Sequence, residues 1–205
     1  MGELIVILGG ARSGKSAEAV RMARARGDGH VLYVATAEPG DDEMRVRIEK
    51  HRAERPTCWD TMEAPHAVGQ RIGREADGHS TIVVDCITLL VSNLLVDKPD
   101  PYDDAVQNSV AQEIEAIVQA AKELPSASKM IIVSNEVGYG LAPLTALGRA
   151  FRDLVGQANQ TLAAAADRVV LMVAGLPLIL KGEEHEESGS PRVGPDANAA
   201  VIGNE

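Results

Sequence analysis

The sequence predicts an α/β fold in which a doubly wound, mostly parallel sheet is flanked by helices. Short aliphatic runs alternate with helix-length segments along most of the 205 residues. Runs such as TIVVDC and KMIIVSN are continuously apolar, as strands of a parallel sheet are when both faces are covered. A glycine-rich turn also joins the first strand to the first helix, which is where such folds bind phosphates.

Each element follows from its local pattern. Aliphatic runs bounded by polar or glycine residues predict strands at 4–8, 30–36, 80–85, 129–134 and 168–174, with a further candidate at 177–181. Segments of helical period and length between them predict helices at 16–26, 41–55, 65–76, 87–96, 103–123 and 144–166.

The turn after the first strand reads GGARSGKS over residues 9–16, which fits the P-loop pattern G-x-x-x-x-G-K-[ST]. Glycine lets the backbone curl so that N–H groups point at an anion, and the following helix adds its positive end. Lys15 is expected to reach the β- and γ-phosphates, and Ser16 to ligate Mg²⁺. The fold prediction is therefore a P-loop NTPase-like sheet that binds nucleotide phosphates.

Composition limits the classes of partner. With 45% hydrophobic and 24% charged residues the chain is typical of a globular protein, and only 2% aromatic residues leave its core to aliphatic side chains. The net charge is −10, which argues against a nucleic-acid surface, since that needs a basic patch. No apolar stretch is long enough for a membrane span, and no signal peptide precedes the first strand, so we expect a cytoplasmic protein.

We expect one P-loop nucleotide-binding catalytic domain over residues 1–181 and an acidic, flexible tail over 182–205. The tail holds six acidic residues against one arginine, so it carries half of the net charge. It lacks apolar periodicity, and such segments do not bury enough surface to order themselves.

Asp85 ends the apolar strand STIVVD, where P-loop enzymes place a second acid that organises Mg²⁺. The alternative is that Asp85 caps the helix that begins near Ile87. With a P-loop present, the interpretation as a Mg²⁺-linked acid is favoured.

The helix predicted at 41–55 places Arg47, His51 and Arg55 at i, i+4 and i+8, on one face. Neighbouring cations disfavour a protonated imidazole, which would leave a ring nitrogen of His51 available for attack. The arginines could also hold a triphosphate. Spacing alone favours the alternative, a solvated polar face.

These blocks together resemble the bifunctional adenosylcobinamide kinase/adenosylcobinamide-phosphate guanylyltransferase family of cobalamin biosynthesis. The resemblance rests on GGARSGKS, LYVAT, DDEMRVRIEKHRAERP, CWDTME, VVDCITLLVSNLL, VSNEVGYG and the segment from FRDLVGQ to LPLILK, in order from about residue 4 to 181. It implies phosphorylation of adenosylcobinamide by ATP or GTP with Mg²⁺. Transfer of GMP from GTP to the product then follows, through a covalent guanylyl-histidine.

The resemblance also implies the site residues. It makes His51 the guanylylated nucleophile and Lys15 a catalytic cation, with Ser16 and Asp85 at the metal. The nucleotide contacts that it implies are Gly9, Gly10, Ala11, Arg12, Ser13, Gly14, Lys15, Ser16, Ala35, Thr36, Ala37, Arg52, Ala53, Glu54, Arg55, Glu63 and Asp85. The family assembles as a homotrimer, so we expect one here.

Two other functions fit part of the pattern. A P-loop small-molecule kinase without guanylyltransferase activity would use His51 only to bind phosphate. A GTP-binding switch protein is disfavoured because the sequence lacks the N-K-x-D segment that reads guanine in that class.

Overall fold

The computed structural model describes residues 2–25, 30–38, 40, 42–53, 55–96 and 98–183. From residue 184 onward the predicted acidic tail lies outside these ranges, as does Glu54. The division into one domain and a tail remains a prediction.

The described elements follow the predicted alternation of strands and helices. The strands are β1 (Glu3–Gly9), β2 (Val31–Ala35), β3 (Asp60–Glu63), β4 (Thr81–Asp85), β5 (Lys129–Val133), β6 (Arg168–Val173) and β7 (Leu176–Lys181). The helices are α1 (Lys15–Arg24), α2 (Asp42–Ala53), α3 (Val68–Glu75), α4 (Ile87–Leu95), α5 (Asp104–Glu123) and α6 (Ala146–Ala165).

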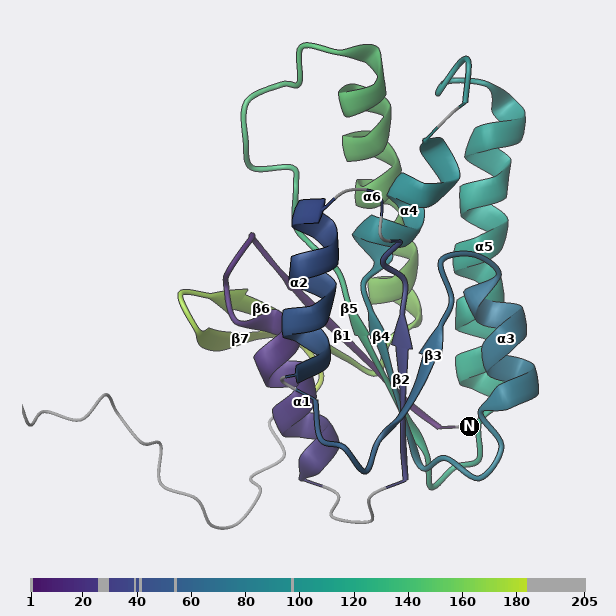
Figure 1. Ribbon diagram of the computed structural model, residues 1–205, viewed down its shortest axis with the longest axis vertical. Coiled ribbons are helices and arrows are strands. Elements are labelled where there is room, and N and C mark those ends of the chain that lie inside the picture. Colours follow the sequence, from purple (N-terminus) through teal and green to yellow (C-terminus); the bar gives the residue numbers. More distant parts are fainter. Residues whose placement is uncertain are drawn as a thin grey trace, which may run out of the picture.

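All these strands form one sheet in the order β3-β2-β4-β5-β1-β6-β7. Every neighbouring pair is parallel except β6 and β7, which form an antiparallel hairpin at one edge. Figure 1 shows the strands side by side with helices in front and behind. The predicted doubly wound, mostly parallel α/β sheet is confirmed.

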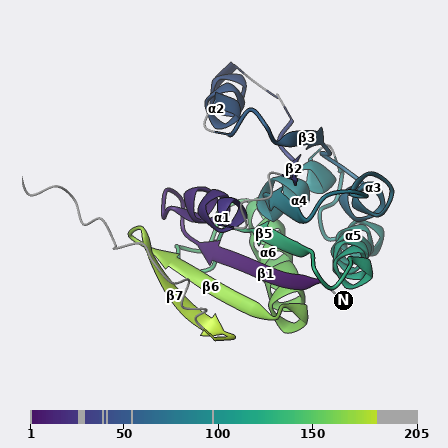
Figure 2. The same cartoon turned by 90° about the horizontal axis from the view of Figure 1, so that it is seen from below.

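The two faces of the sheet are covered unequally. The larger core packs α3, α4, α5 and α6 against one face, and its sheet residues include Val6, Val84 and Ile132. The smaller core packs α1 against the other face, around Ile7, Val83 and Ile131. Figure 2 shows α2 standing out from these layers near β2 and β3. No described helix is both long and apolar enough to cross a bilayer.

Two local predictions were incomplete. The strand β3 was not predicted, because Met62 is the one buried residue of its four, so it has no apolar run, and it pairs with β2 at the sheet edge. The helix predicted at 41–55 ends earlier, at Ala53, so Arg55 does not lie on it. Pro56 explains the difference, since a proline disfavours helical backbone at the residue before it.

Gly69 sets how closely α3 approaches α5, and alanine at this position is expected to destabilise the protein. A Cβ atom here would lie 2.6 Å from both the carbonyl oxygen of Ala116 and the amide nitrogen of Ile117. Backbone atoms cannot move aside as a flexible side chain can. We expect Gly69→Ala to lower the free energy of unfolding by about 1–3 kcal/mol in urea denaturation.

Gly73, one turn further along the same helix, provides the matched control. A Cβ atom at Gly73 would have no neighbour within 4 Å, and the residue is exposed. Gly73→Ala is expected to be neutral or to stabilise by about 0.5–1 kcal/mol, because alanine suits a helix better than glycine. Equal effects of the two substitutions would show that the α3–α5 approach does not limit stability.

Candidate nucleotide site

The P-loop is formed as the sequence predicts, between β1 and α1. Gly9 has φ 152° and Gly14 has φ 97°, both in the region that favours glycine. A Cβ atom on Gly9 would lie 2.6 Å from the carbonyl oxygen of Met172 and 2.6 Å from Oγ of Ser13. Gly9 is therefore required by the close passage of β6 as well as by the turn itself.

Lys15 lies inside this loop. Its side chain is buried, with 7% of the residue exposed, although it carries an ammonium group. Nζ donates to the carbonyl oxygen of Gly10 at 2.5 Å and lies 3.4 Å from Oγ of Ser13. The cation thus occupies the concave side of the turn, where a bound phosphate group would meet it.

The hairpin of β6 and β7 supports the loop from the other side. The amide of Gly175, in the hairpin turn, donates to the carbonyl oxygen of Ser13 at 3.0 Å. This contact was not predicted, because nothing in the local sequence around residue 175 indicates that it approaches residue 13. The hairpin therefore belongs to the support of the phosphate-binding loop.

The carboxyl ends of the parallel strands bring other predicted residues into one row. Glu63 on β3 is in register with Ala35 on β2, and Ala35 is in register with Asp85 on β4. Across β5, Asp85 is level with Val133, which is level with Ile7 on β1, two residues before Gly9. In open parallel sheets, ligands bind at the carboxyl ends of the strands. The sheet thus gathers Ala35, Glu63, Asp85 and the P-loop at one edge.

Asp85 has a defined partner in Tyr33. The hydroxyl of Tyr33 donates to Oδ2 of Asp85 at 2.5 Å. Burial and the neighbouring Asp85 carboxylate both raise the pKa of Tyr33, so its hydroxyl keeps its proton. The alternative role of Asp85 as a helix cap is wrong, because Cys86 occupies the N-cap position of α4 and no side chain caps that end.

Cys86, next to Asp85, is a second nucleophile to consider at this edge. The pKa of its thiol is raised to about 11, mainly by burial and secondly by the charge of Asp85. The thiol is therefore protonated at neutral pH and is a poor nucleophile.

The segment 35–37 is tied to the same strand end. Thr36 is fully buried, and its Oγ1 accepts from the amide of Cys86 at 2.8 Å and donates to the carbonyl oxygen of Cys86 at 2.7 Å. Its hydroxyl therefore holds β2 and β4 together. Ala35 and Ala37, on either side, are half-buried at the edge, where only backbone groups or a methyl group could meet a nucleotide.

The helix α2 carries the predicted nucleophile, His51, together with Arg52 and Ala53. Arg52 forms an ion pair with Glu63 at the end of β3, which attaches this end of α2 to the sheet edge. Figure 2 shows α2 apart from α1, the helix that begins at Lys15. The two catalytic candidates thus come from separate elements, and only the backbone of His51 is described.

Arg55 lies over the aromatic ring of Tyr33 on β2, beside Trp59 of the segment that leads into β3. Its guanidinium carbon is 3.8 Å from the centre of the Tyr33 ring, and Tyr33 in turn stacks on Trp59 at 6.4 Å. The prediction that Arg55 shares a helix face with Arg47 and His51 is therefore wrong. Nε and Nη1 of Arg55 are buried without a hydrogen-bond partner among the described residues. Such open donors over the ring of Tyr33 are suited to phosphate oxygens.

Ser16 and Asp85 together suit a magnesium ion bound with its nucleotide. Oδ2 of Asp85 accepts from the Tyr33 hydroxyl, and among the described residues no side chain is recorded on the second carboxylate oxygen, which could meet a cation or its water. Within the described residues no group of three or more His, Cys, Asp or Glu side chains could hold a metal alone. A magnesium ion needs only one or two protein ligands, because phosphates and water complete its shell.

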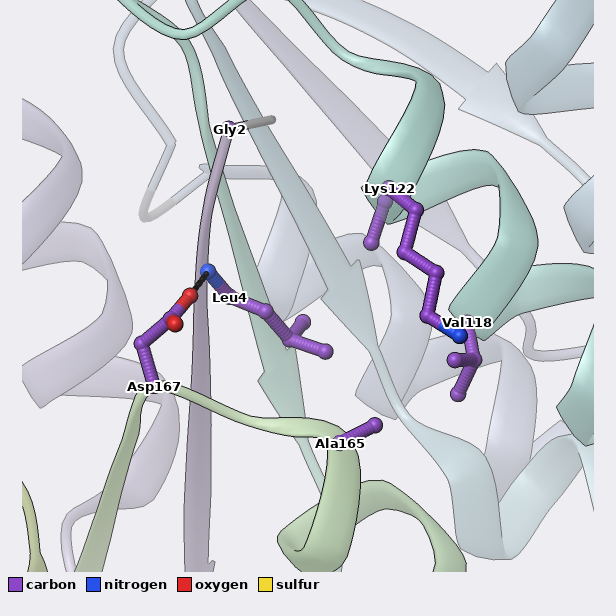
Figure 3. Close-up of a pocket in the computed structure, with 7 residues that line it drawn as sticks. Gly2, Leu4, Val118, Lys122, Ala165 and Asp167 are labelled. Carbon is purple, nitrogen blue, oxygen red and sulfur yellow. Dashed lines mark hydrogen bonds between the residues drawn. The ribbon is translucent and has the colours of Figure 1, made fainter.

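A small hollow elsewhere in the molecule is a poor candidate for the site. Figure 3 shows it beside Gly2, Leu4, Lys122 and Asp167. These residues lie near the amino end of β1, whereas the P-loop follows its carboxyl end. Its empty volume is about 210 Å³, and part of that space is open solvent. One carboxylate oxygen of Asp167 is already engaged by the amide of Leu4 at 2.8 Å.

Comparison with known proteins indicates the function of the residues at the carboxyl ends of the strands. The model of the cobinamide kinase / cobinamide phosphate guanyltransferase family matches residues 5–180. This chain belongs to that family. The match includes the P-loop, α2 and the strand ends that carry Glu63 and Asp85, and it confirms the resemblance seen in the sequence.

Curated relatives agree over most of their length. The bifunctional adenosylcobalamin biosynthesis protein CobP of Pseudomonas aeruginosa is 45% identical, over 87% of this chain and 97% of that protein. The protein named CobU is 40% identical in Escherichia coli and 39% identical in Salmonella typhimurium, each over 87% of this chain and 99% of the relative. Among solved structures, the flagellar accessory protein FlaH of Methanocaldococcus jannaschii gives a TM-score of 0.46 at 17% identity, covering 88% of this chain and 79% of that one.

Proposed function

We propose that this protein phosphorylates adenosylcobinamide with a nucleoside triphosphate and then transfers GMP from GTP to adenosylcobinamide phosphate. The observation that carries the proposal is the family match over residues 5–180, which spans both the P-loop and the helix bearing His51. The buried cation of the loop supports it, because such a charge inside a glycine-rich turn serves to bind phosphates.

In the first reaction, the hydroxyl oxygen of the substrate's aminopropanol arm attacks the γ-phosphorus of the triphosphate. The bond from that phosphorus to the β–γ bridging oxygen breaks, the nucleoside diphosphate leaves, and the hydroxyl proton is released. Lys15 and Arg55 are the cations suited to the charge on the phosphate oxygens. No enzyme nucleophile is needed, since catalysis here is positioning and charge stabilisation.

In the second reaction, a ring nitrogen of His51 attacks the α-phosphorus of GTP and pyrophosphate leaves. The phosphate of the first product then attacks the phosphorus of the histidine–GMP adduct, the P–N bond breaks, and His51 is regenerated. Histidine suits this role because it is a good nucleophile and a good leaving group as a phosphoramidate. The ion pair of Arg52 with Glu63 supports the role, since it anchors the neighbouring residue at the sheet edge.

Mg²⁺ is proposed as the metal, held by the hydroxyl of Ser16 and the carboxylate of Asp85. When bound, it would neutralise charge on the transferring phosphates. The other predicted contacts are proposed to line the nucleotide: Gly9 to Ser16, Ala35, Ala37, Arg52, Arg55 and Glu63. Thr36 is proposed to hold the strands that frame it. Ala53 and Glu54 are also proposed as nucleotide contacts, and Glu54 lies outside the described residues.

Tyr33→Phe tests whether the hydroxyl of Tyr33 orients the Asp85 carboxylate for the metal. The substitution removes the hydrogen bond from the Tyr33 hydroxyl to Oδ2 of Asp85, so the carboxylate should be free to turn. We expect about a tenfold rise in the Mg²⁺ concentration for half-maximal kinase activity, as for partners that orient metal ligands. Mn²⁺ affinity measured by electron paramagnetic resonance, with nucleotide present, should fall in parallel.

Tyr102→Phe is the control, because Tyr102 is an exposed tyrosine in the connection before α5. It should leave both metal measurements unchanged. If Tyr33→Phe folds with normal stability and keeps the wild-type Mg²⁺ requirement, its hydroxyl has no part in orienting Asp85.

The covalent step has a direct assay. Incubation of the protein with α-labelled GTP and Mg²⁺, without corrinoid, should give protein-bound label that is acid-labile and base-stable, as a phosphoramidate is. Pyrophosphate should appear in equal amount. A protein that phosphorylates adenosylcobinamide but never takes up label would be a kinase alone.

We also propose that the protein works as a homotrimer in the cytoplasm, where its nucleoside triphosphate substrates are found. Support for an assembly comes from the edge strand β7. Leu176, Leu178 and Leu180 all stand more than half exposed there, and Val173 does so beside them. A sheet edge with exposed leucines is a typical contact surface. Sedimentation equilibrium measures the number of subunits.

A further inference from the structure

The loop between β5 and α6 carries large apolar side chains that stand exposed in the described part of the chain. Tyr139 is 86% exposed, and Leu141 and Leu144 are each 97% exposed. Figure 1 shows this loop, in green, extending well outside the layers before it returns to α6. Exposed apolar side chains that gather in one segment often mark a binding surface, whereas single exposed ones are common on any protein.

The start of the loop is fixed to the nucleotide site. The amide of Glu136 donates to the carbonyl oxygen of Gly9, the first P-loop residue, at 2.9 Å. The carboxylate of Glu136 then accepts from the amide of Gly138 at 2.8 Å, which sets the direction in which the loop leaves the sheet. The loop therefore begins beside the phosphate-binding turn.

Its return to α6 is fixed as well. Arg149 donates from Nη1 to the carbonyl oxygens of Pro143 at 3.1 Å and Leu144 at 2.9 Å. Thr145 caps α6 by accepting from the amide of Gly148 at 3.1 Å. Polar contacts thus hold the backbone at both ends of the loop while Tyr139, Leu141 and Leu144 remain outside.

The exposed part of the loop contains no charged residue, although Glu136 lies at its start and Arg149 bonds to its end. Residues 137–148 contain no Asp, Glu, Lys or Arg, in a chain whose net charge is −10. Such a surface suits a large ligand with apolar faces and neutral amide groups, and it does not suit a phosphate or a polyanion. The acceptor of the proposed kinase reaction has that chemistry, since a corrin ring carries methyl groups and carboxamide arms.

We infer that the loop over residues 137–145 is the docking surface for the corrinoid ring of the acceptor, with Tyr139, Leu141 and Leu144 as its apolar contacts. The inference rests on the proposed function, because the acceptor hydroxyl must reach the γ-phosphate in the P-loop. A loop bonded to Gly9 is placed to hold the ring while the aminopropanol arm enters the site. A contact between subunits would not need the loop to lie beside the P-loop. The exposed leucines of β7 offer a separate surface for such a contact.

The test is the triple variant Tyr139→Ser/Leu141→Ser/Leu144→Ser, with Tyr102→Ser as the control at another exposed tyrosine. We expect the KM for adenosylcobinamide in the kinase reaction to rise at least about tenfold. That is the loss of affinity expected when the ligand can no longer cover even one large apolar side chain. The KM for the triphosphate and the uptake of GMP label from GTP alone should stay within about twofold of wild type, because neither involves the corrinoid.

Sedimentation and wild-type activity separate the alternatives. An unchanged KM for the corrinoid overturns the inference. Dissociation of the oligomer with equal loss of both reactions would also overturn it, and would assign the loop to a subunit contact. If the wild-type protein itself fails to phosphorylate adenosylcobinamide, the proposed function fails, whatever the variant does.

Discussion

Replacing Lys15 by alanine is expected to lower both the kinase and the guanylyltransferase rates by at least about 100-fold. Both reactions need negative charge neutralised on a triphosphate, and Lys15 places its ammonium inside the turn that would hold it. A preorganised cation in a buried position is worth more than one in water, because no solvent must rearrange around it.

Lys15→Met separates the charge from the shape of the loop. Methionine keeps an unbranched side chain in the buried space and removes only the cation, so it should lose as much activity as alanine while keeping the loop packed. Lys122→Ala, at an exposed lysine of α5 beside the small hollow at the other sheet edge, is the control and should be silent. Steady-state kinetics of both reactions, with thermal unfolding as a check on folding, decide the matter. Near-wild-type turnover in either reaction by Lys15→Met would contradict a shared phosphate site.

Replacing His51 by alanine is expected to abolish the covalent GMP adduct and guanylyl transfer while much of the kinase activity survives. The kinase reaction transfers phosphate directly and needs no enzyme nucleophile. Cys86, the other candidate at the sheet edge, cannot replace the histidine, because burial keeps its thiol protonated. His51→Asn should behave as alanine does if the role is covalent, since an amide cannot form the adduct.

Intact-protein mass spectrometry after treatment with GTP and Mg²⁺ reports the adduct directly. His30→Ala is the control, since His30 is an exposed histidine just before β2, at the amino end of that strand. It should take up GMP as wild type does. A GMP adduct that persists on His51→Ala would remove His51 from the mechanism, and activity retained by His51→Asn would reduce the ring to a hydrogen-bonding role.

Local patterns in the sequence were sufficient for the P-loop and for the strands that bury both faces. The turn at residues 9–16 depends on glycines and a lysine within a few residues of one another, and strands such as Thr81–Asp85 depend on a continuous aliphatic run. The family could be inferred for a related reason, since its motifs occur in order along the chain.

Contacts between distant segments could not be read in this way. The hydrogen bond from Tyr33 to Asp85 joins residues 52 positions apart, and the amide of Gly175, after β6, donates to the carbonyl oxygen of Ser13, after the neighbouring strand β1. Both depend on which strands lie side by side, and no local pattern states the order of the strands.

The sequence by itself determined the alternation of strands and helices, the phosphate-binding turn with Lys15, the acid at the end of β4 and the family. Tertiary structure decided that β3 joins the sheet at its edge, that Arg55 stacks on Tyr33, and that the hydroxyl of Thr36 bonds to the backbone of Cys86. The reason is physical: backbone propensity and apolar periodicity act over a few residues, whereas edge pairing, stacking and buried hydrogen bonds form only when packing brings remote segments together.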